Sequence, residues 1–300
     1  MDVSVIIVNY NTKAYLNDCL KSVYQHTKDI EFEVLVSDNG STDGSIESVK
    51  QNFKNVILIE NKKNIGFGAA NNKALDIAKG EFILFLNSDT VLINNGIKIF
   101  YDFWYNYPHP ELLGALGCNL LNKDLRITNS GGCFFAFWRD LKYFFKIYCY
   151  LILISFGYKR KKRVPVVNKY FGEIDVIVGA DLFLKNNEDA YFDDYFFLYH
   201  EEVDLEYRLA KKGLKRILID GPEIIHFEGK SDNADVLNKK YAYHSSFSRI
   251  NDFLSRIKYY KKNKNNPVAF FLLKFIILLI FIYPPLFTRT SRYLKDLLAI

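Results

Sequence analysis

Apolar and polar positions alternate in blocks over the first third of the chain. Short runs rich in Val, Ile, Leu and Phe alternate with segments whose apolar residues recur at helical spacing, as at Leu16, Cys19, Leu20 and Val23. The apolar runs predict strands over 3–8, 33–37, 56–59 and 81–86, and the segments between and after them predict helices over 14–25, 45–53 and 68–79. Strands that alternate with helices indicate βαβ units and a mostly parallel sheet. The strands lack polar alternation, which fits burial on both faces.

The rest of the chain is less regular. Strands are predicted over 114–121, 173–178 and 215–219, and a helix over 202–212. Residues 134–158 are dense in aromatic and aliphatic side chains, and so are residues 268–283, where Lys274 is the one charged residue. We therefore expect an α/β domain over 1–231, with an aromatic and basic insert at about 134–163, and a helical C-terminal region over 232–300.

Polar residues follow each of the first four predicted strands, at 9–12, 37–44, 61–68 and 87–89. In an open parallel sheet, ligands bind beyond the carboxyl ends of the strands. Turn chemistry explains any one of these loops, but four on one rim favour a ligand site. The pattern contains neither GxGxxG nor GxxxxGK[ST], which excludes a dinucleotide fingerprint and a Walker loop.

Of these segments, Asn87-Ser-Asp89 gives the most specific indication of function. A carboxylate at the end of a buried strand is costly unless it is paired or binds a cation. A hard divalent ion would stabilise Asp89 and would also bind a diphosphate. The alternative is that Asp89 caps a helix beginning near Asn94.

A second cluster of acids lies at Glu201, Glu202 and Asp204, at the start of a predicted helix. The positive end of the helix dipole favours carboxylates there, which is a sufficient structural explanation. The functional alternative is that one of them accepts a proton from an attacking hydroxyl. Arg208, one turn beyond Asp204, can pair with it. His226 follows a later strand, in a loop that suits a metal or phosphate role beside the commoner structural one.

Several runs together resemble the family 2 glycosyltransferases with a GT-A fold, and within them the rhamnosyltransferase-like branch. The matching runs, in the family's order, are Ser4–Asn11, Ser37–Gly44, Asn64–Asn72, Phe85–Thr90, Gly179-Ala180, Phe192–Arg208 and His226–Ser231. They cover roughly residues 1–231. The resemblance implies a Rossmann-like domain with a mostly parallel central sheet and flanking helices, followed here by a C-terminal helical segment that associates with membranes.

The resemblance also implies site residues. The nucleotide and donor sugar would be bound by Val8, Asn9, Asn11, Asp38, Asn39, Asn64, Gly66, Asn71, Asn87 and Ser88. Asp89 and His226 would hold Mg²⁺ or Mn²⁺, with Asn87 in place of the first acid of the family's DxD motif. Glu202 would be the catalytic base, where the family usually has Asp, and Glu201 and Asp204 are the alternatives. The basic residue often found after the Gly-Ala segment corresponds at best to Lys185.

The implied activity is inverting transfer of a sugar, with rhamnose as one candidate, from a dTDP- or UDP-linked donor. The acceptor would be a lipid-linked saccharide or a polysaccharide in bacterial surface glycan synthesis. One alternative keeps the fold and uses a UDP-hexose or UDP-N-acetylhexosamine. Another is a catalytically inactive nucleotide-binding scaffold at the membrane, because Asn87 and Glu202 both depart from the family pattern.

Composition and charge indicate a membrane-associated protein. The chain has 300 residues, 16% of them aromatic, and a net charge of +6, which excludes a disordered or low-complexity protein. The aromatic excess lies in 134–158 and 270–287, and basic residues flank it at 159–163 and 258–264. This arrangement favours an anionic membrane surface over nucleic acid.

The apolar run over 268–283 is shorter than the ~20 residues of a spanning helix. We therefore expect peripheral or monotopic attachment at the cytoplasmic face of the bacterial inner membrane. One membrane helix and a buried core helix are the competing interpretations. Four cysteines without a CxxC pair and the lack of a signal peptide fit the cytoplasmic side. The sequence leaves open whether the chain forms a homo-oligomer.

Overall fold

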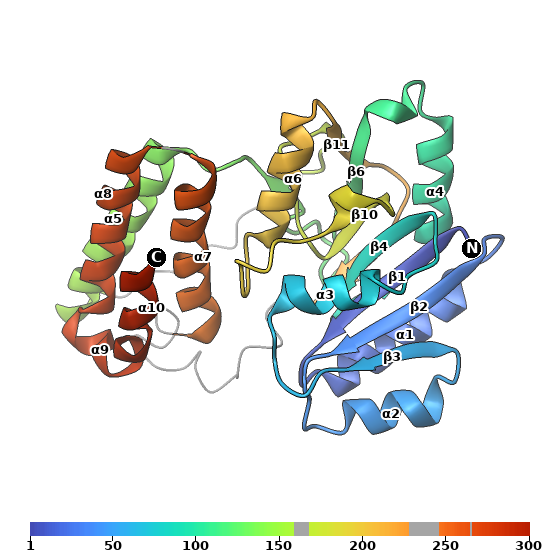
Figure 1. The fold of residues 1–300 in the computed structure, drawn as a ribbon, viewed down its shortest axis with the longest axis horizontal. Coiled ribbons are helices and arrows are strands. Elements are labelled where there is room, and N and C mark those ends of the chain that lie inside the picture. Colours follow the sequence, from blue (N-terminus) through green and yellow to red (C-terminus); the bar gives the residue numbers. More distant parts are fainter. Residues whose placement is uncertain (159–167, 228–245, 265) are drawn as a thin grey trace. The chain divides into compact units, whose positions relative to one another are not determined.

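The structure is a computed structural model that describes residues 1–158, 168–227, 246–264 and 266–300 (Figure 1). Its contacts divide the chain into two compact units. The α/β unit comprises residues 1–134, 167–197 and 201–231, and the helical unit comprises residues 135–166, 198–200 and 232–300. The predicted basic run at 159–163 and the end of the His226–Ser231 motif lie outside the described residues.

The α/β unit is built on an eight-stranded sheet with the order β3-β2-β1-β4-β10-β6-β11-β8 (Figure 1). The strands are β1 (Val3–Asn9), β2 (Phe32–Asp38), β3 (Val56–Glu60), β4 (Phe82–Asn87), β6 (Leu113–Cys118), β8 (Gly172–Glu173), β10 (Asp181–Lys185) and β11 (Lys215–Ile219). Four neighbouring pairs are parallel, namely β1 with β2, β1 with β4, β2 with β3 and β6 with β11. The predicted α/β class with a mostly parallel sheet is therefore confirmed.

Alternating residues of the strands enter two separate cores, one on each face of the sheet. Val5 and Ile7 of β1 pack on one side with α1 (Lys13–His26), α2 (Ser45–Asn52) and α4 (Gly96–Asn106). Ile6 packs on the other side with α3 (Phe67–Leu75) and α6 (Glu201–Lys211). Burial on both faces explains why the strands contain no polar alternation.

The strand β10 is a feature that the apolar pattern did not predict. It lies in the middle of the sheet and runs antiparallel to both β4 and β6. The strand predicted over 173–178 is instead two short strands, β8 and β9 (Val176–Ile177), and β9 pairs with β7 (Gly131–Gly132) outside the main sheet. The helix predicted over 68–79 ends earlier, at Leu75.

A small two-stranded sheet brings a distant segment to the end of β4. In it, β5 (Thr90–Leu92) pairs antiparallel with β12 (Ile224–His226), so that His226 lies opposite Thr90. The described residues also contain three short 3-10 helices, η1 (Pro110–Leu112), η2 (Glu188–Ala190) and η5 (Ser291–Tyr293).

The helical unit contains α5, α7, α8, α9 and α10 (Figure 1). Their bounds are Phe137–Ser155, Phe247–Asn263, Pro267–Phe281, Pro284–Thr290 and Leu294–Ala299. Apolar side chains of all five helices form its core. Side-chain caps start two helices, with Ser246 accepting from the Arg249 amide and Asn266 from the Ala269 amide. Within the described part of the chain, every helix is too short or too polar to cross a bilayer.

Candidate active site

The ends of three neighbouring parallel strands bring the predicted donor-binding residues to one rim. Asn9 at the end of β1 lies opposite Asp38 at the end of β2. On the other side of β1, Val8 lies opposite Asn87 at the end of β4. The carboxyl-end rule therefore places these four residues together, as the sequence predicts.

Asn9 and Asp38 form the buried centre of this rim. The Asn9 amide donates to Asp38 Oδ2 at 2.7 Å and to Ser41 Oγ at 3.0 Å. The other oxygen of Asp38 accepts the Ser41 N–H at 2.7 Å. Asn11, with φ of 54°, accepts the Thr42 N–H at 2.8 Å. The first two strand-end loops are thus joined by side-chain hydrogen bonds that fix the Asp38 carboxylate.

A second group of residues shapes the loop before α3. The Asn39 amide donates to the Gly66 carbonyl at 3.1 Å, and Asn64 accepts the Gly66 N–H at 3.0 Å. Gly66 has a φ of +97°, and a Cβ there would lie 2.5 Å from the carbonyl oxygen of Phe197. Only glycine fits this conformation and this close approach. Asn71 is buried within α3, where its amide donates to the Phe67 carbonyl at 3.1 Å.

Ser88 connects the β1 and β4 ends. Its hydroxyl lies 2.9 Å from that of Thr12, and both side chains are buried. The Thr12 hydroxyl also contacts the Asn9 amide oxygen at 2.6 Å. A chain of hydrogen bonds therefore runs from Ser88 through Thr12 and Asn9 to Asp38.

Asp89 and His226 face each other beside this chain. His226 Nε2 lies 3.3 Å from Asp89 Oδ1 and 3.5 Å from the Asn87 amide nitrogen. The two side chains of the Asp89–His226 pair are 14% and 10% exposed. Asp89 does not cap a helix: β5 follows it, and α4 has Asn95 at its N-cap position. The capping alternative is therefore wrong.

The side chains at this point can ligate a divalent cation whose coordination shell a diphosphate would complete. One carboxylate, one imidazole and the side-chain amide of Asn87 lie together here, and a carboxylate with an imidazole suits Mn²⁺ and, through the carboxylate oxygens, Mg²⁺. No group of three or more His, Cys, Asp or Glu side chains forms a metal cage among the described residues. A cation would therefore need phosphate oxygens or water to fill its coordination shell.

The three acids of α6 have different environments. Asp204 is fully buried and pairs with Arg208 Nε at 3.3 Å, which confirms the predicted pair. Glu201 is buried, and burial together with the neighbouring Glu202 charge raises its pKa well above the usual range. Glu202 is half-buried. A Cβ on Gly179 would lie 3.5 Å from Glu202 Cβ, so Gly179 borders the stem of the Glu202 side chain. Of the three acids, only Glu202 is partly accessible to solvent.

Asp181 is an acid that the sequence reasoning missed. It opens β10 opposite Leu86 of β4, is fully buried, and accepts the Cys118 N–H at 2.7 Å. Burial raises the pKa of Asp181 to about 7, although that hydrogen bond and the nearby His226 lower it. The available signal was a lone Asp at the start of an apolar run after Gly179-Ala180.

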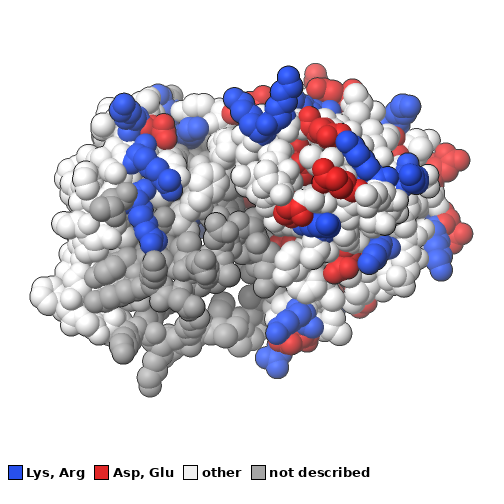
Figure 2. Space-filling model, turned by 90° about the horizontal axis from the view of Figure 1, so that it is seen from below, with Lys and Arg blue, Asp and Glu red and all other residues white. Residues whose placement is uncertain are grey.

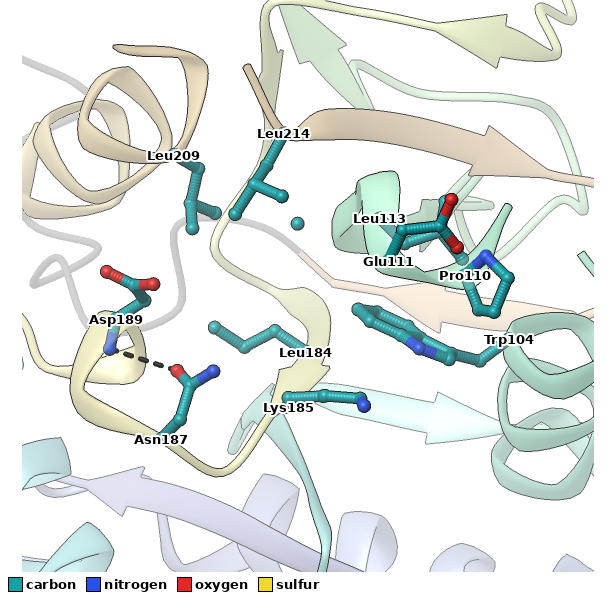
Figure 3. Close-up of a pocket in the computed structure, with 11 residues that line it drawn as sticks. Trp104, Pro110, Glu111, Leu113, Leu184, Lys185, Asn187, Asp189, Leu209 and Leu214 are labelled. Atoms are coloured by element: carbon teal, nitrogen blue, oxygen red, sulfur yellow. Dashed lines mark hydrogen bonds between the residues drawn. The ribbon is translucent and has the colours of Figure 1, made fainter. Parts of the chain in front are cut away.

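The antiparallel direction of β10 separates Lys185 from the rim. Lys185 pairs with Phe82 at the beginning of β4, at the opposite edge of the sheet. It lines a cavity of about 180 Å³ there, together with Trp104, Asn187 and Leu214 (Figure 3). Lys185 therefore does not provide the basic residue that the family places near the donor, and this cavity is distinct from the rim.

The comparisons with known proteins find glycosyltransferases. A sequence model of "Glycosyl transferase family 2" matches residues 4–138. The poly(ribitol-phosphate) beta-glucosyltransferase of Bacillus spizizenii is 36% identical over 121 residues, which are 39% of this chain and 19% of that protein. The N-acetylglucosaminyl-diphospho-decaprenol L-rhamnosyltransferase of Mycobacterium tuberculosis is 24% identical over 263 residues, which are 81% of both.

A solved structure shares the fold. The mannosyltransferase PcManGT from Pyrobaculum calidifontis, in complex with GDP-Man and Mn²⁺, superposes with a TM-score of 0.56. The match covers 99% of this chain and 86% of that one at 16% identity, so it shows the fold alone. The chain thus has a GT-A-like α/β fold. The match to the glycosyl transferase family 2 model covers residues 4–138, less than half of the chain.

Proposed function

We propose that this chain is an inverting glycosyltransferase that takes a sugar from a nucleoside diphosphate. The observation that carries the proposal is the single rim that joins Asn9 and Asp38 to Asp89 and His226 through Ser88 and Thr12. A carboxylate with a fixed amide beside it can hydrogen-bond a nucleotide base. The Asp89–His226 pair would hold Mg²⁺ or Mn²⁺, which supplies positive charge for the diphosphate.

Glu202 is the proposed base. The acceptor oxygen forms a bond to the anomeric carbon while the bond from that carbon to the diphosphate oxygen breaks. The acceptor proton passes to the Glu202 carboxylate, and the electron pair of the broken bond leaves with the diphosphate. Attack on the face opposite the diphosphate inverts the anomeric configuration, and no covalent enzyme intermediate is needed. Arg208 holds Asp204 one turn along α6, and burial of Glu201 favours its neutral form.

The donor and acceptor are proposed from the relatives. The mycobacterial relative is named for an L-rhamnosyl transfer to a diphospho-decaprenol saccharide, and its match extends over most of the chain. This supports a dTDP-linked rhamnose donor and a lipid-linked acceptor for surface glycan synthesis. The Bacillus spizizenii relative is named as a glucosyltransferase, which supports a UDP-hexose as the alternative donor.

The helical unit supplies the membrane surface in this proposal. Val268, Phe271, Leu272 and Phe275 recur at helical spacing on α8 and are 66%, 63%, 44% and 56% exposed. Trp138 on α5 is 77% exposed. On the face in Figure 2, the helical unit is mostly uncharged, with a few Lys and Arg side chains. Exposed apolar helix faces beside basic residues suit shallow attachment to the cytoplasmic face of a bacterial inner membrane.

The test is a donor screen on the full chain. Thermal stabilisation and sugar release are measured with dTDP-rhamnose, UDP-glucose and UDP-N-acetylglucosamine, each with Mn²⁺, with Mg²⁺ and with EDTA. We expect cation-dependent stabilisation and release with dTDP-rhamnose. A response only to a UDP-sugar would select the alternative donor. Binding without release, even with a polyprenyl-diphosphate acceptor, would favour an inactive scaffold, and no response to any nucleotide would overturn the proposal.

A further inference from the structure

The three residues before α6 pack with the helical unit. Residues 198–200 belong to that unit, whereas Glu201, the next residue, begins the part of the α/β unit that contains α6. Glu202, the base proposed above, is therefore only two residues beyond His200 in the sequence. Consecutive Cα atoms are about 3.8 Å apart, so the position of His200 constrains that of Glu202.

Two hydrogen bonds from α7 hold this short segment. Ser255 Oγ donates to the Leu198 carbonyl at 2.8 Å. His200 Nε2 lies 2.8 Å from Asp252 Oδ1, and His200 is 8% exposed. The ring of Phe135 meets the imidazole edge to face at a centroid distance of 4.7 Å. Both the backbone and the side chain of the segment are thus fixed.

The backbone of the segment is in a conformation that needs such support. Tyr199 and His200 have φ angles of 67° and 69°. Left-handed backbone is unfavourable for any residue other than glycine, because the Cβ approaches the following carbonyl oxygen. Two such residues in a row persist only where surrounding contacts determine them.

Asp252 is itself fixed from several sides. Arg249 Nη1 lies 3.0 Å from its Oδ2, and Arg256 Nη2 lies 3.4 Å from its Oδ1. Burial would raise the pKa of Asp252, but His200 and the two guanidinium groups hold it well below its usual range. Arg256 also reaches Asp140 on α5 at 3.1 Å. The partner of His200 is therefore an ionised carboxylate in a buried network that spans α5 and α7.

We propose that His200, held by Asp252, is a positioning residue for the reaction. The pair sets where α6 begins and so places the Glu202 carboxylate. The inference rests on the proposed function, because it assigns no chemistry to His200 itself. A base displaced by about 1 Å loses rate by up to about 100-fold, whereas nucleotide binding at the strand-end rim depends on other residues.

The first experiment measures amide hydrogen exchange in the full chain, without any donor. The variants are His200→Ala, Asp252→Ala and the double variant, with Thr290→Val as the control. Thr290 is buried in the same unit and donates to the Leu286 carbonyl at 3.0 Å, so its loss weakens that unit without touching His200. We expect exchange over 198–206 to become about tenfold faster in the first three variants and to stay unchanged in the control.

The second experiment separates positioning from folding by kinetics. His200→Ala is expected to lower kcat by about tenfold or more and to leave the donor KM within about twofold. His200→Gln keeps an N–H donor for Asp252 and is expected to recover most of kcat. The double variant is expected to be no slower than the Asp252→Ala variant, because that single change already removes the interaction with His200.

Unchanged exchange over 198–206 in Asp252→Ala would overturn the inference, whatever the activity. So would additive losses in the double variant, or equal losses in Thr290→Val. If exchange rises as expected but the wild-type chain transfers no sugar, the proposed function is wrong. The anchoring of α6 by His200 and Asp252 is then still supported.

Discussion

The imidazole of His226 and the carboxylate of Asp89 lie 3.3 Å apart, although 136 positions of the sequence separate them. The pairing of β12 with β5 creates this approach, because His226 lies opposite Thr90. Asp89→Asn and His226→Ala should each abolish cation-dependent stabilisation by a nucleotide sugar. Calorimetric titration of the donor with Mn²⁺ and with EDTA measures this.

Asp102→Asn is the matched control for that prediction. Asp102 pairs with Lys98 on α4, away from the rim, so its loss removes a carboxylate without affecting the cation. An Asp89→Asn chain that keeps the full Mn²⁺ effect would contradict the assignment.

Replacement of the proposed base should separate chemistry from binding. Glu202→Gln is expected to lower kcat by about 10²–10⁴-fold and to change the donor KM little, because proton transfer affects the transition state. Glu201→Gln should lower kcat much less, since burial already favours the neutral form of Glu201. Steady-state kinetics of the three chains provide the measurement. A larger loss of kcat for Glu201→Gln than for Glu202→Gln would reassign the base.

Gly66 should tolerate no side chain. Gly66→Ala combines a left-handed backbone with a Cβ 2.5 Å from the Phe197 oxygen. Gly213, with φ of +78° and no atom within 4 Å of its Cβ, is the control. Gly213→Ala should cost about 1–2 kcal/mol of unfolding free energy, and Gly66→Ala clearly more. Urea unfolding of both variants measures the difference, and equal losses would show that the Phe197 contact has no energetic weight.

Asp181 should make the fold less stable as pH rises. Its pKa is raised to about 7 in the folded chain, against about 3.9 when unfolded, so the folded state holds a proton that the unfolded state releases. The free energy of unfolding therefore falls from about pH 4 to about pH 7 and then levels off for this group.

Asp181→Asn removes that dependence and can still accept the Cys118 N–H. The variant should gain stability relative to wild type as pH rises across this window, as measured by urea unfolding at pH 5 and pH 8. If the two chains differ in unfolding free energy by the same amount at pH 5 and at pH 8, the raised pKa of Asp181 is contradicted. The pKa values of Glu201 and Glu206 are also raised, mainly by burial, which both chains share; the charge of Asp181 contributes least to the raised pKa of Glu206.

The apolar face of α8 should bind lipid. Phe271→Glu with Phe275→Glu is expected to lower co-sedimentation with phosphatidylglycerol vesicles by about tenfold or more, since each buried aromatic contributes about 1.5–3 kcal/mol. Leu125→Glu with Ile77→Glu adds the same charge at exposed apolar positions of the α/β unit and is the control. Equal sedimentation of the two double variants would exclude this face as the membrane surface.

Local sequence patterns were sufficient to predict the first half of the α/β unit. Strand ends that are adjacent in a parallel sheet converge, so Asn9, Asp38 and Asn87 could be placed together without a structure. The direction of β10 could not be predicted in this way. An apolar run such as Asp181–Lys185 shows burial, but it does not show which strands it pairs with or in which sense.

Pairs that depend on distant segments were also beyond the sequence. His200 and Asp252 are both ordinary polar residues in their local context, and only the packing of α7 brings them together. Asp181 was missed because its burial follows from the position of β10 between β4 and β6. Arg208 and Asp204, by contrast, are one helical turn apart, and their pairing could be predicted from spacing alone.

The interleaving of the two units along the chain has a practical consequence for expression. The core of the helical unit combines α5, before residue 166, with α7 and α8, after residue 246. A recombinant fragment that stops at residue 231 would keep α5 and lose the helices that cover Phe144, Ile147 and Leu151. Such a fragment would expose these side chains to water and would aggregate, even if its nucleotide-binding strands folded correctly.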